Sequence, residues 1–408
     1  MTKPQEAPPR KRRDEPKPTD VPVHMRRDGL DPLPELRRMR AETPFVRGVS
    51  PVGDSWIATG LDEVRAILGD TDRFSTNPVA DTAAESRRLA QAGNPLQNDP
   101  PEHTRIRKML TPELTVRRMR RMEPVVEEVV ADRLGALERA GQPADLMRHF
   151  AWPVPGLVAC ALFGIPRDDQ PQLTRNMLLG QRRDGPRKQV MAAEHAFTDY
   201  LDRFVARKRL DPSGDDLISM LLRDHGESIT DADLVGLIDA TIGAGLENMA
   251  GMLGLGTLAL LDHPEQLALL RERPELMGQA VEELLRYVAV VPLANFRTAL
   301  VDVEFAGRSV KAGEVVACSL FAANRTQYPD APQDDLDITR GSTTHVGFGH
   351  GIHFCVGAPL ARMELRIAFA RLLERFPRLR LAVPREELRF RSQSRPIYGI
   401  EKLPLAWE

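Results

Sequence analysis

Cysteine is scarce in this chain, whose 408 residues include only Cys160, Cys318 and Cys355. The three lie far apart and form no CxxC pair, so a disulfide framework is not expected and a reducing compartment is favoured. Charge of one sign is also lacking, because the formal net charge is only −2. No overall field therefore attracts nucleic acid or an anionic membrane surface. The scarcity of cysteine and the small net charge predict a cytoplasmic protein that binds neither nucleic acid nor a membrane.

We do not expect a secretory signal either. Residues 1–24 are rich in proline and charge and contain no apolar run, so we expect a disordered arm. Residues 25–408 show no internal repeat, and 42% of the whole chain is hydrophobic. This composition suffices for one large domain with a substantial core.

The residue pattern of that domain predicts mostly helix. Helices are expected over 62–70, 103–140, 145–164, 187–209, 214–223, 230–262, 264–289 and 358–376. Short strands and turns are expected in 44–60, 296–316 and 379–405. The first of these is rich in Val, Ile and Trp around Gly-Asp and predicts a small hairpin. Because no regular βαβ alternation appears, we predict a mainly α fold with small β-sheets.

The segment 234–261 is the one stretch long and apolar enough to suggest a membrane span. Polar residues interrupt it, Glu247 and Asn248 among them, and charges there would be costly in lipid. Thr230 and Asp233 form a helix-starting box, so a long helix through the centre of the protein is the better interpretation. A carboxylate halfway along such a helix indicates either a functional role or pairing with a core arginine.

The segment from Gly347 to Arg362 reads GFGHGIHFCVGAPLAR. Its first three glycines permit tight turns and close approach to a flat ligand. Cys355 stands just before an expected helix start, where free backbone N–H groups lower the pKa of a thiol. One thiolate cannot build a structural zinc site, which usually needs four protein ligands. It suffices for the iron of a porphyrin, which brings its own four donors. The alternative for a lone cysteine is a small apolar core residue.

This segment resembles the cytochrome P450 family, whose pattern Phe-x-x-Gly-x-x-x-Cys-x-Gly is matched by Phe348, Gly351, Cys355 and Gly357. The resemblance covers roughly residues 25–405. It implies the cytochrome P450 fold, haem b as the cofactor and Cys355 as the iron ligand, with Phe348 and Gly357 beside the haem.

Two further groups of residues match the family in separate motifs. Glu283 and Arg286 stand three apart, and such a pair alone is usually a surface salt bridge. The resemblance implies instead a buried structural clamp that Arg340 completes. It also implies that the anionic haem propionates are bound by a second group of residues, where arginine offers a fork of donors suited to carboxylates. These expected haem-binding residues are His103, Arg107, Arg297 and His353.

The expected central helix carries the family's oxygen-activating motif with one departure. Ala244 and Gly245 match the small pair that widens the groove for oxygen, and Glu247 matches the acid that helps to route protons. Asn248 replaces the usual threonine, and an amide is a poor proton shuttle. Three interpretations stay open: Asn248 holds a water, the substrate assists protonation, or substrate radicals couple without oxygen insertion.

The resemblance also implies a largely apolar pocket for a small organic substrate. Its expected wall residues are Ile238, Val290, Val291, Leu293, Ala294, Asn295, Ile397 and Tyr398. Electrons are expected from a ferredoxin and its ferredoxin reductase. Basic residues such as Arg105, Lys108 and Arg362 either form the docking face for this partner or are plain solvated surface. We expect a monomer.

Three functions remain in competition after this reasoning. The leading one is a monooxygenase that hydroxylates a small molecule of secondary metabolism. The nearest alternative is a cytochrome P450 that couples C–C, C–N or aryl groups oxidatively without net oxygen insertion. The remote alternative is a non-catalytic haem protein that binds a small ligand, which would leave the Glu247 motif unexplained.

Overall fold

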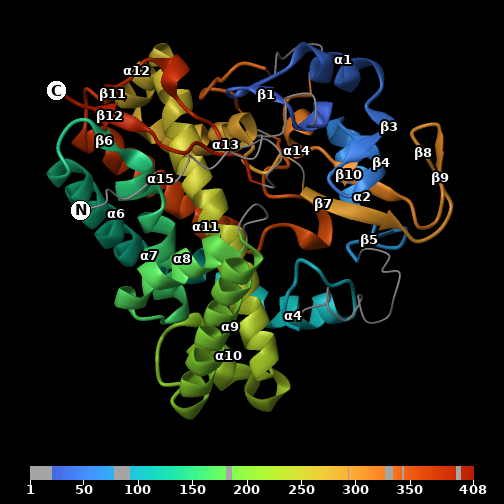
Figure 1. Ribbon diagram of the computed structural model, residues 1–408, viewed down its shortest axis with the longest axis horizontal. Coiled ribbons are helices and arrows are strands. Elements are labelled where there is room, and N and C mark those ends of the chain that lie inside the picture. Colours follow the sequence, from blue (N-terminus) through green and yellow to red (C-terminus); the bar gives the residue numbers. More distant parts are fainter. Residues whose placement is uncertain are drawn as a thin grey trace, which may run out of the picture.

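The structure is a computed structural model that describes residues 21–77, 92–180, 186–292, 294–326, 334–341, 344–391 and 397–408. Helices form most of the molecule, and the larger sheet lies to one side of them (Figure 1). The predicted fold class, mainly α with small sheets, is confirmed. The predicted arm, residues 1–24, lies mostly outside the described residues. Its last part is ordered, because Val21 and His24 are buried.

Most of the helices follow the predicted segments, with breaks at prolines. The longer ones are α1 (Pro34–Glu42), α2 (Leu61–Gly69), α4 (Glu102–Leu110), α6 (Glu123–Arg139), α7 (Pro153–Phe163), α8 (Gln170–Gly180), α9 (Arg187–Leu210), α10 (Leu217–His225), α11 (Asp231–Asp262), α12 (Pro264–Glu272), α13 (Met277–Val288) and α15 (Ala358–Arg375). The short α5 (Val116–Met119) and α14 (Leu320–Ala323) are the remaining α-helices of the described residues. The single helix expected over 103–140 is divided near Pro112, and that over 264–289 near Pro274, because proline has no N–H to donate to the preceding turn.

The described residues form four small sheets beside the helices. The largest has the strand order β3 (Phe45–Ser50), β4 (Gly53–Ala58), β10 (Val315–Cys318), β7 (Ala294–Ala299) and β5 (Phe74–Ser75). The others pair β1 (Arg27–Asp28) with β2 (Asp31–Pro32), β8 (Val303–Phe305) with β9 (Arg308–Val310), and β12 (Pro404–Ala406) with both β11 (Arg380–Leu381) and β6 (Ala144–Asp145). The predicted hairpin in 44–60 is confirmed as β3 and β4, which pair antiparallel.

Helix α11 runs through the middle of the molecule (Figure 1). The predicted capping box is present, because the Thr230 side chain accepts the N–H of Asp233 and the Asp233 carboxylate accepts the N–H of Thr230. Within the described part of the chain, α11 is the one helix long and apolar enough to cross a membrane, but 72% of its most apolar window is buried inside the protein. Its contacts with α7, α9, α13 and α15 make it the central core helix.

Arg27, near the start of the described chain, contacts residues from its C-terminal third. The guanidinium of Arg27 lies 3.6 Å from the ring centre of Phe321 and 4.5 Å from that of Tyr398. It also donates to the carbonyls of Val288 and Ala289, at the end of α13. This buried cation therefore ties the N-terminal strand to α13, α14 and the C-terminal turn.

Candidate functional site

The loop that carries Cys355 is shaped by glycines and ends at the start of α15. Gly349 and Gly351 have φ values of 76° and 72°, a region that favours glycine. A side chain at Gly351 would also meet the carbonyl of Leu68 at 2.4 Å. The N–H of Cys355 donates to the carbonyl of Phe348 at 2.9 Å, which closes the loop and places the sulfur just before the helix.

The sulfur lies in a buried setting with donors around it. Burial has the largest effect and raises the pKa of the Cys355 thiol, while the N–H groups of Gly357 and Ala358 and the nearby Arg107 guanidinium lower it. From the sequence we expected only that backbone N–H groups lower the pKa of this thiol. Because burial outweighs the donors, a bound metal cation is what would hold this sulfur as a thiolate.

Cationic and imidazole groups from three segments gather near this loop. The rings of His103, on α4, and His353 lie 4.3 Å apart between centroids, and Arg297 is buried on β7. Nε2 of His353 and one terminal nitrogen of Arg297 are buried and have no hydrogen-bond partner in the described part of the chain. Arg107 donates to the carbonyl of Phe354 at 2.9 Å. The Arg297 nitrogen is a donor without a partner, whereas Nδ1 of His353 faces the carbonyl of Pro95, so Nε2 becomes a donor only when the ring is protonated. Both groups are suited to binding an anion, which would favour that protonation.

The state of charge of these groups follows from their burial. Burial lowers the pKa of His353 to about 4, with the charges of Arg297 and His103 acting in the same direction. Burial also lowers the pKa of His103 and of Arg297 from their ordinary values. An anion placed among them would offset the cost of burying the Arg297 guanidinium.

The expected structural clamp is assembled in the core. Arg286 donates to both carboxylate oxygens of Glu283 at 2.7 and 2.8 Å, and Arg340 reaches the same carboxylate at 3.3 Å. Glu283 and Arg286 are 0% and 1% exposed. Arg286 also donates to the carbonyls of Asn324 and Asp335 at 2.9 Å, so the clamp fixes α13 to the loops that follow α14.

The middle of α11 is open where the oxygen-activating motif was expected. Ala244 is exposed, and a methyl group built on Gly245 would have no described atom within 4 Å. The amide oxygen of Asn248 is buried and has no described hydrogen-bond partner. The carboxylate of Glu247 forms an ion pair with Arg391. Of the two possibilities left open for this carboxylate, the structure therefore shows the arginine pairing.

The residues expected to line the substrate pocket divide into three groups. Ile238, Val290 and Tyr398 are buried, at 0%, 6% and 2% exposure. Val291 and Ile397 are half-buried. Leu293 and the side chains of Ala294 and Asn295 lie outside the described part of the chain.

Tyr398, expected in the pocket wall, has its hydroxyl bound to another part of the core. Its hydroxyl donates to the carbonyl of Gly29 at 2.7 Å, and its ring stacks on Phe390. Because the hydroxyl already donates to this carbonyl, it is not placed to orient a substrate. The contact partner lies 369 residues away, so no local pattern could have indicated it.

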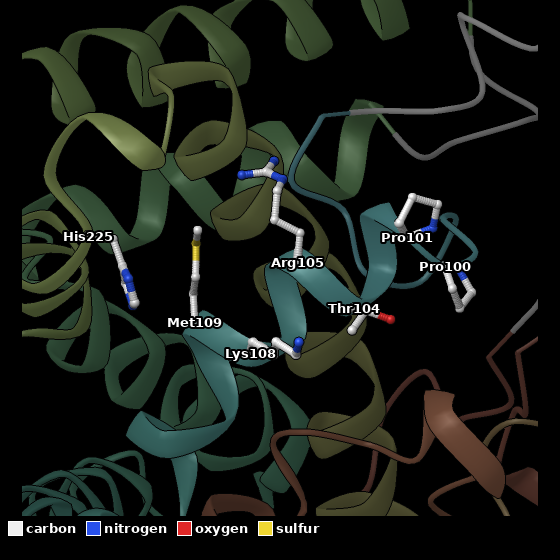
Figure 2. Close-up of a pocket in the computed structure, with 7 residues that line it drawn as sticks. All are labelled: Pro100, Pro101, Thr104, Arg105, Lys108, Met109 and His225. Carbon is white, nitrogen blue, oxygen red and sulfur yellow. The ribbon is translucent and has the colours of Figure 1, made fainter.

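A separate hollow of about 820 Å³ lies on the outer face of α4 (Figure 2). Its lining residues are Pro100, Pro101, Thr104, Arg105, Lys108, Met109 and His225. Arg105 and Lys108 were expected at a docking face, but Arg105 is engaged with Glu102 and Asp233 at 2.6 and 2.7 Å. His103, Arg107 and Cys355 are not among the residues that line this hollow.

Comparison with known proteins gives consistent matches along the chain. The family profile described as Cytochrome P450 matches residues 52–387. Cytochrome P450 165C4 of Amycolatopsis orientalis is 45% identical over 390 residues, which cover 93% of this chain and 95% of that protein.

Solved structures agree with these sequence matches. OxyC, described as implicated in an oxidative C–C coupling reaction during vancomycin biosynthesis, is 45% identical, with a TM-score of 0.85 over 93% of this chain and 96% of that one. OxyB from teicoplanin biosynthesis, solved as a complex with an X-domain, is 46% identical, with a TM-score of 0.85 over 95% of this chain and 100% of that one.

Proposed function

The chain belongs to the cytochrome P450 family, and from this premise we propose that it joins two aryl groups of a peptide precursor oxidatively, without inserting oxygen. It is an oxidoreductase of secondary-metabolite type, as its relatives are. In the proposed reaction each aryl group loses one hydrogen and a bond forms between them. Dioxygen takes two electrons from the substrate and two from a redox partner, and with protons it leaves as two waters.

The family implies a haem iron, and the residues of the site fit one. We propose haem b, with Sγ of Cys355 as the iron ligand. The unpartnered donor of Arg297 and the protonated ring of His353, together with His103 and Arg107, would bind the propionates. When bound, the haem iron supplies the activation of dioxygen. The side chains of α11 would govern the supply of protons to this chemistry.

The observation that carries the coupling proposal is the side chain at position 248. Asn248 has a buried amide oxygen without a described partner, where the family's usual residue has a hydroxyl. An amide can donate or accept a hydrogen bond, but it does not relay protons as a hydroxyl with water does. We infer that oxygen insertion is disfavoured here and that removal of hydrogen from the substrate dominates. The coupling described for OxyC supports this inference.

Electron supply requires a partner, for which we propose a ferredoxin with its reductase. A hollow of about 360 Å³ between α5, α13 and α15 is bordered by Arg120, Arg362 and Arg366 and lies beside the helix that begins after Cys355. Arg362 pairs with Glu282 and Arg366 with Glu123, so Arg120 is the cation of this border that an acidic electron carrier would complement.

Other partners and the setting are also proposals. The complex of OxyB with an X-domain supports docking of an accessory protein domain on this chain. We further propose that residues 25–408 act as one monomeric, cytoplasmic domain.

Product mass tests the coupling proposal. The purified protein, with a ferredoxin, its reductase and candidate linear peptides, is expected to yield a product lighter by two hydrogens. No label should enter the product from isotopic dioxygen. The variant Asn248→Thr, which restores a hydroxyl, is expected to divert part of the product to one that contains a labelled oxygen.

The control is Asn248→Gln, which keeps the amide and should give only the coupled product. A wild-type product heavier by one labelled oxygen would overturn the proposal and identify a monooxygenase. Absence of turnover with every peptide, in protein that shows the thiolate-type spectrum and accepts electrons, would also count against it.

A further inference from the structure

The chain between α13 and β7 makes a strained turn, which we call the 288–292 turn. Helix α13 ends at Val288, and Ala289 follows with φ 41° and ψ 68°, a left-handed conformation that is unfavourable for a residue with a side chain. The guanidinium of Arg27 donates to the carbonyls of Val288 and Ala289 at 2.7 and 2.6 Å. A side chain from the first strand therefore stabilises a turn that local backbone preferences oppose.

The two aromatic residues that enclose Arg27 bind the next part of this turn. The ring centres of Phe321 and Tyr398 lie 3.6 and 4.5 Å from the guanidinium. The backbone N–H of Tyr398 donates to the carbonyl of Val290 at 2.7 Å, and that of Phe321 donates to the carbonyl of Pro292 at 3.5 Å. Arg27, Phe321 and Tyr398 together form what we call the lock around Arg27, and this lock holds the 288–292 turn along its length.

The turn packs against α11 close to the side chain that carries the coupling proposal. A methyl group built on Gly251 would lie 3.2 Å from Cγ1 of Val290. Gly251 follows Asn248 by three residues, so the two are neighbours on the surface of α11. The side chain of Val291, the next residue of the turn, is half-buried. These positions support the expectation that Val290 and Val291 border the substrate.

The fork of an arginine suits the lock better than another cation would. Arg27 is 4% exposed, and burial lowers its pKa to about 9, so the side chain is still a cation at neutral pH. A planar guanidinium donates to two carbonyls at once and stacks on aromatic faces, whereas the ammonium of lysine is a point charge on a flexible stem. Arg27→Lys therefore keeps the charge and removes the geometry.

We propose that Arg27 is a positioning residue that sets how closely the 288–292 turn approaches α11 and thereby determines which aryl groups the substrate pocket accepts. Arg27 acts through the backbone of the turn and does not touch the substrate. The inference rests on the proposed function in one respect, namely that an aryl group of the substrate lies against this turn.

The proposal is tested with two probes, imidazole and C-phenylimidazole, which both bind haem iron through a ring nitrogen. Their dissociation constants are measured on the haem-loaded protein from the shift of the Soret band. Imidazole occupies the iron alone, whereas the phenyl ring extends toward the wall. For Arg27→Lys we expect the preference for C-phenylimidazole over imidazole to fall by about tenfold, the effect of a misfit of roughly one methylene in an apolar pocket. An unchanged preference would overturn the proposal.

Two further variants test the route from Arg27 to the pocket. Glycine adopts a positive φ without strain, so Ala289→Gly added to Arg27→Lys should restore most of the preference. A double variant no better than Arg27→Lys would contradict positioning through this turn. Val291→Ala leaves the lock intact and shortens the wall, so it should also lower the preference, and it decides the matter if Arg27→Lys does not fold. An unchanged preference in Val291→Ala would mean that the turn does not border the ligand.

Arg325 provides a matched control. It is 0% exposed, its guanidinium lies 3.8 Å from the ring centre of Tyr287, and it donates to the carbonyls of Leu30 and Tyr287 at 3.1 and 2.9 Å. It thus joins the same N-terminal segment to α13, but before the strained turn begins. Arg325→Lys should lower the thermal unfolding temperature as Arg27→Lys does, and its probe preference should stay at the wild-type value.

An equal fall of the preference in Arg325→Lys would show that any loosening of the core moves the wall, and this would contradict a specific role of Arg27. The probe measurements need no turnover, so they are valid whether or not a coupled product forms. Product mass, measured separately, reports on the proposed coupling.

Discussion

The two sides of the haem site differ in how the protein specifies them. On the cysteine side, the backbone dominates: glycines at positive φ, a closing N–H to carbonyl bond and the start of α15 place the sulfur of Cys355. On the α11 side, side chains dominate: the amide of Asn248 and the ion pair of Glu247 with Arg391. Backbone geometry leaves little freedom to vary iron ligation, whereas single side chains can redirect the oxygen chemistry.

The largest expected effect tests the cysteine side. Cys355→Ser is expected to abolish the thiolate-type Soret band of the reduced, carbon monoxide-treated protein completely, because a neutral hydroxyl does not replace a thiolate on iron. Cys160→Ala is the control, since Cys160 is buried within α7, and it should keep the band. If Cys355→Ser kept the band, Cys355 would not be the iron ligand, and the contrast between the cysteine side and the α11 side would no longer hold.

A second, intermediate effect concerns a buried acid on the helix that follows Cys355. Glu364 is 3% exposed, one of its oxygens has no described partner, and burial raises its pKa to about 8. The pKa of Glu364 is higher in the folded protein than in the unfolded chain. At a pH between these two values the carboxyl is ionised only in the unfolded chain, so the free energy of unfolding falls as pH rises. The expected slope approaches roughly 1.4 kcal/mol per pH unit between about pH 5 and pH 8.

Glu364→Gln should remove that slope. The measurement is the free energy of unfolding of Glu364→Gln minus that of wild type, from urea titrations at several pH values in this window. The difference should grow with pH in favour of the variant. A difference that stays constant would show that the carboxyl is ionised throughout, and the cysteine side would then contain a charge that the structure does not pair.

The smallest effect tests the openness of the α11 side. Gly245→Ala meets no described atom within 4 Å, and alanine favours helix, so a gain of up to about 1 kcal/mol in stability is expected. The added methyl group should nevertheless weaken carbon monoxide binding, because it narrows the groove. Gly256→Ala on the same helix is the contrast, since its methyl group would meet the Phe369 ring at 2.6 Å and should destabilise the protein. Equal losses in both variants would contradict an open groove.

Much of the fold was predictable because local rules were sufficient. The capping box of Thr230 and Asp233 marked the start of α11, and a stretch rich in Val, Ile and Trp around Gly-Asp marked the β3–β4 hairpin. Helices α1 and α8 were missed, since α1 has few apolar residues and α8 presents a weak apolar face. The divisions near Pro112 and Pro274 were missed because the helical pattern was read across prolines.

The site was predictable only where a motif carried it. The cysteine loop and the clamp of Glu283 with Arg286 have fixed spacing, so the sequence identified them and the structure brings the clamp together. Arg391 and the core position of Tyr398 depend on partners 144 and 369 residues away in the chain, which no local pattern indicates. The sequence did raise the possibility of an arginine beside Glu247, but it could not say which one.

The lock around Arg27 has a consequence for how the protein is made. Arg27 contacts Val288, Phe321 and Tyr398, so its binding site is built from chain that a ribosome releases hundreds of residues later. Until that part of the chain emerges, the first strand has no surface to pack against. The Arg27 guanidinium, which is buried in the folded protein, stays exposed to water during this time. Completion of the core is thus postponed to the last stage of synthesis, and a nascent chain truncated before residue 398 lacks the ring that closes it.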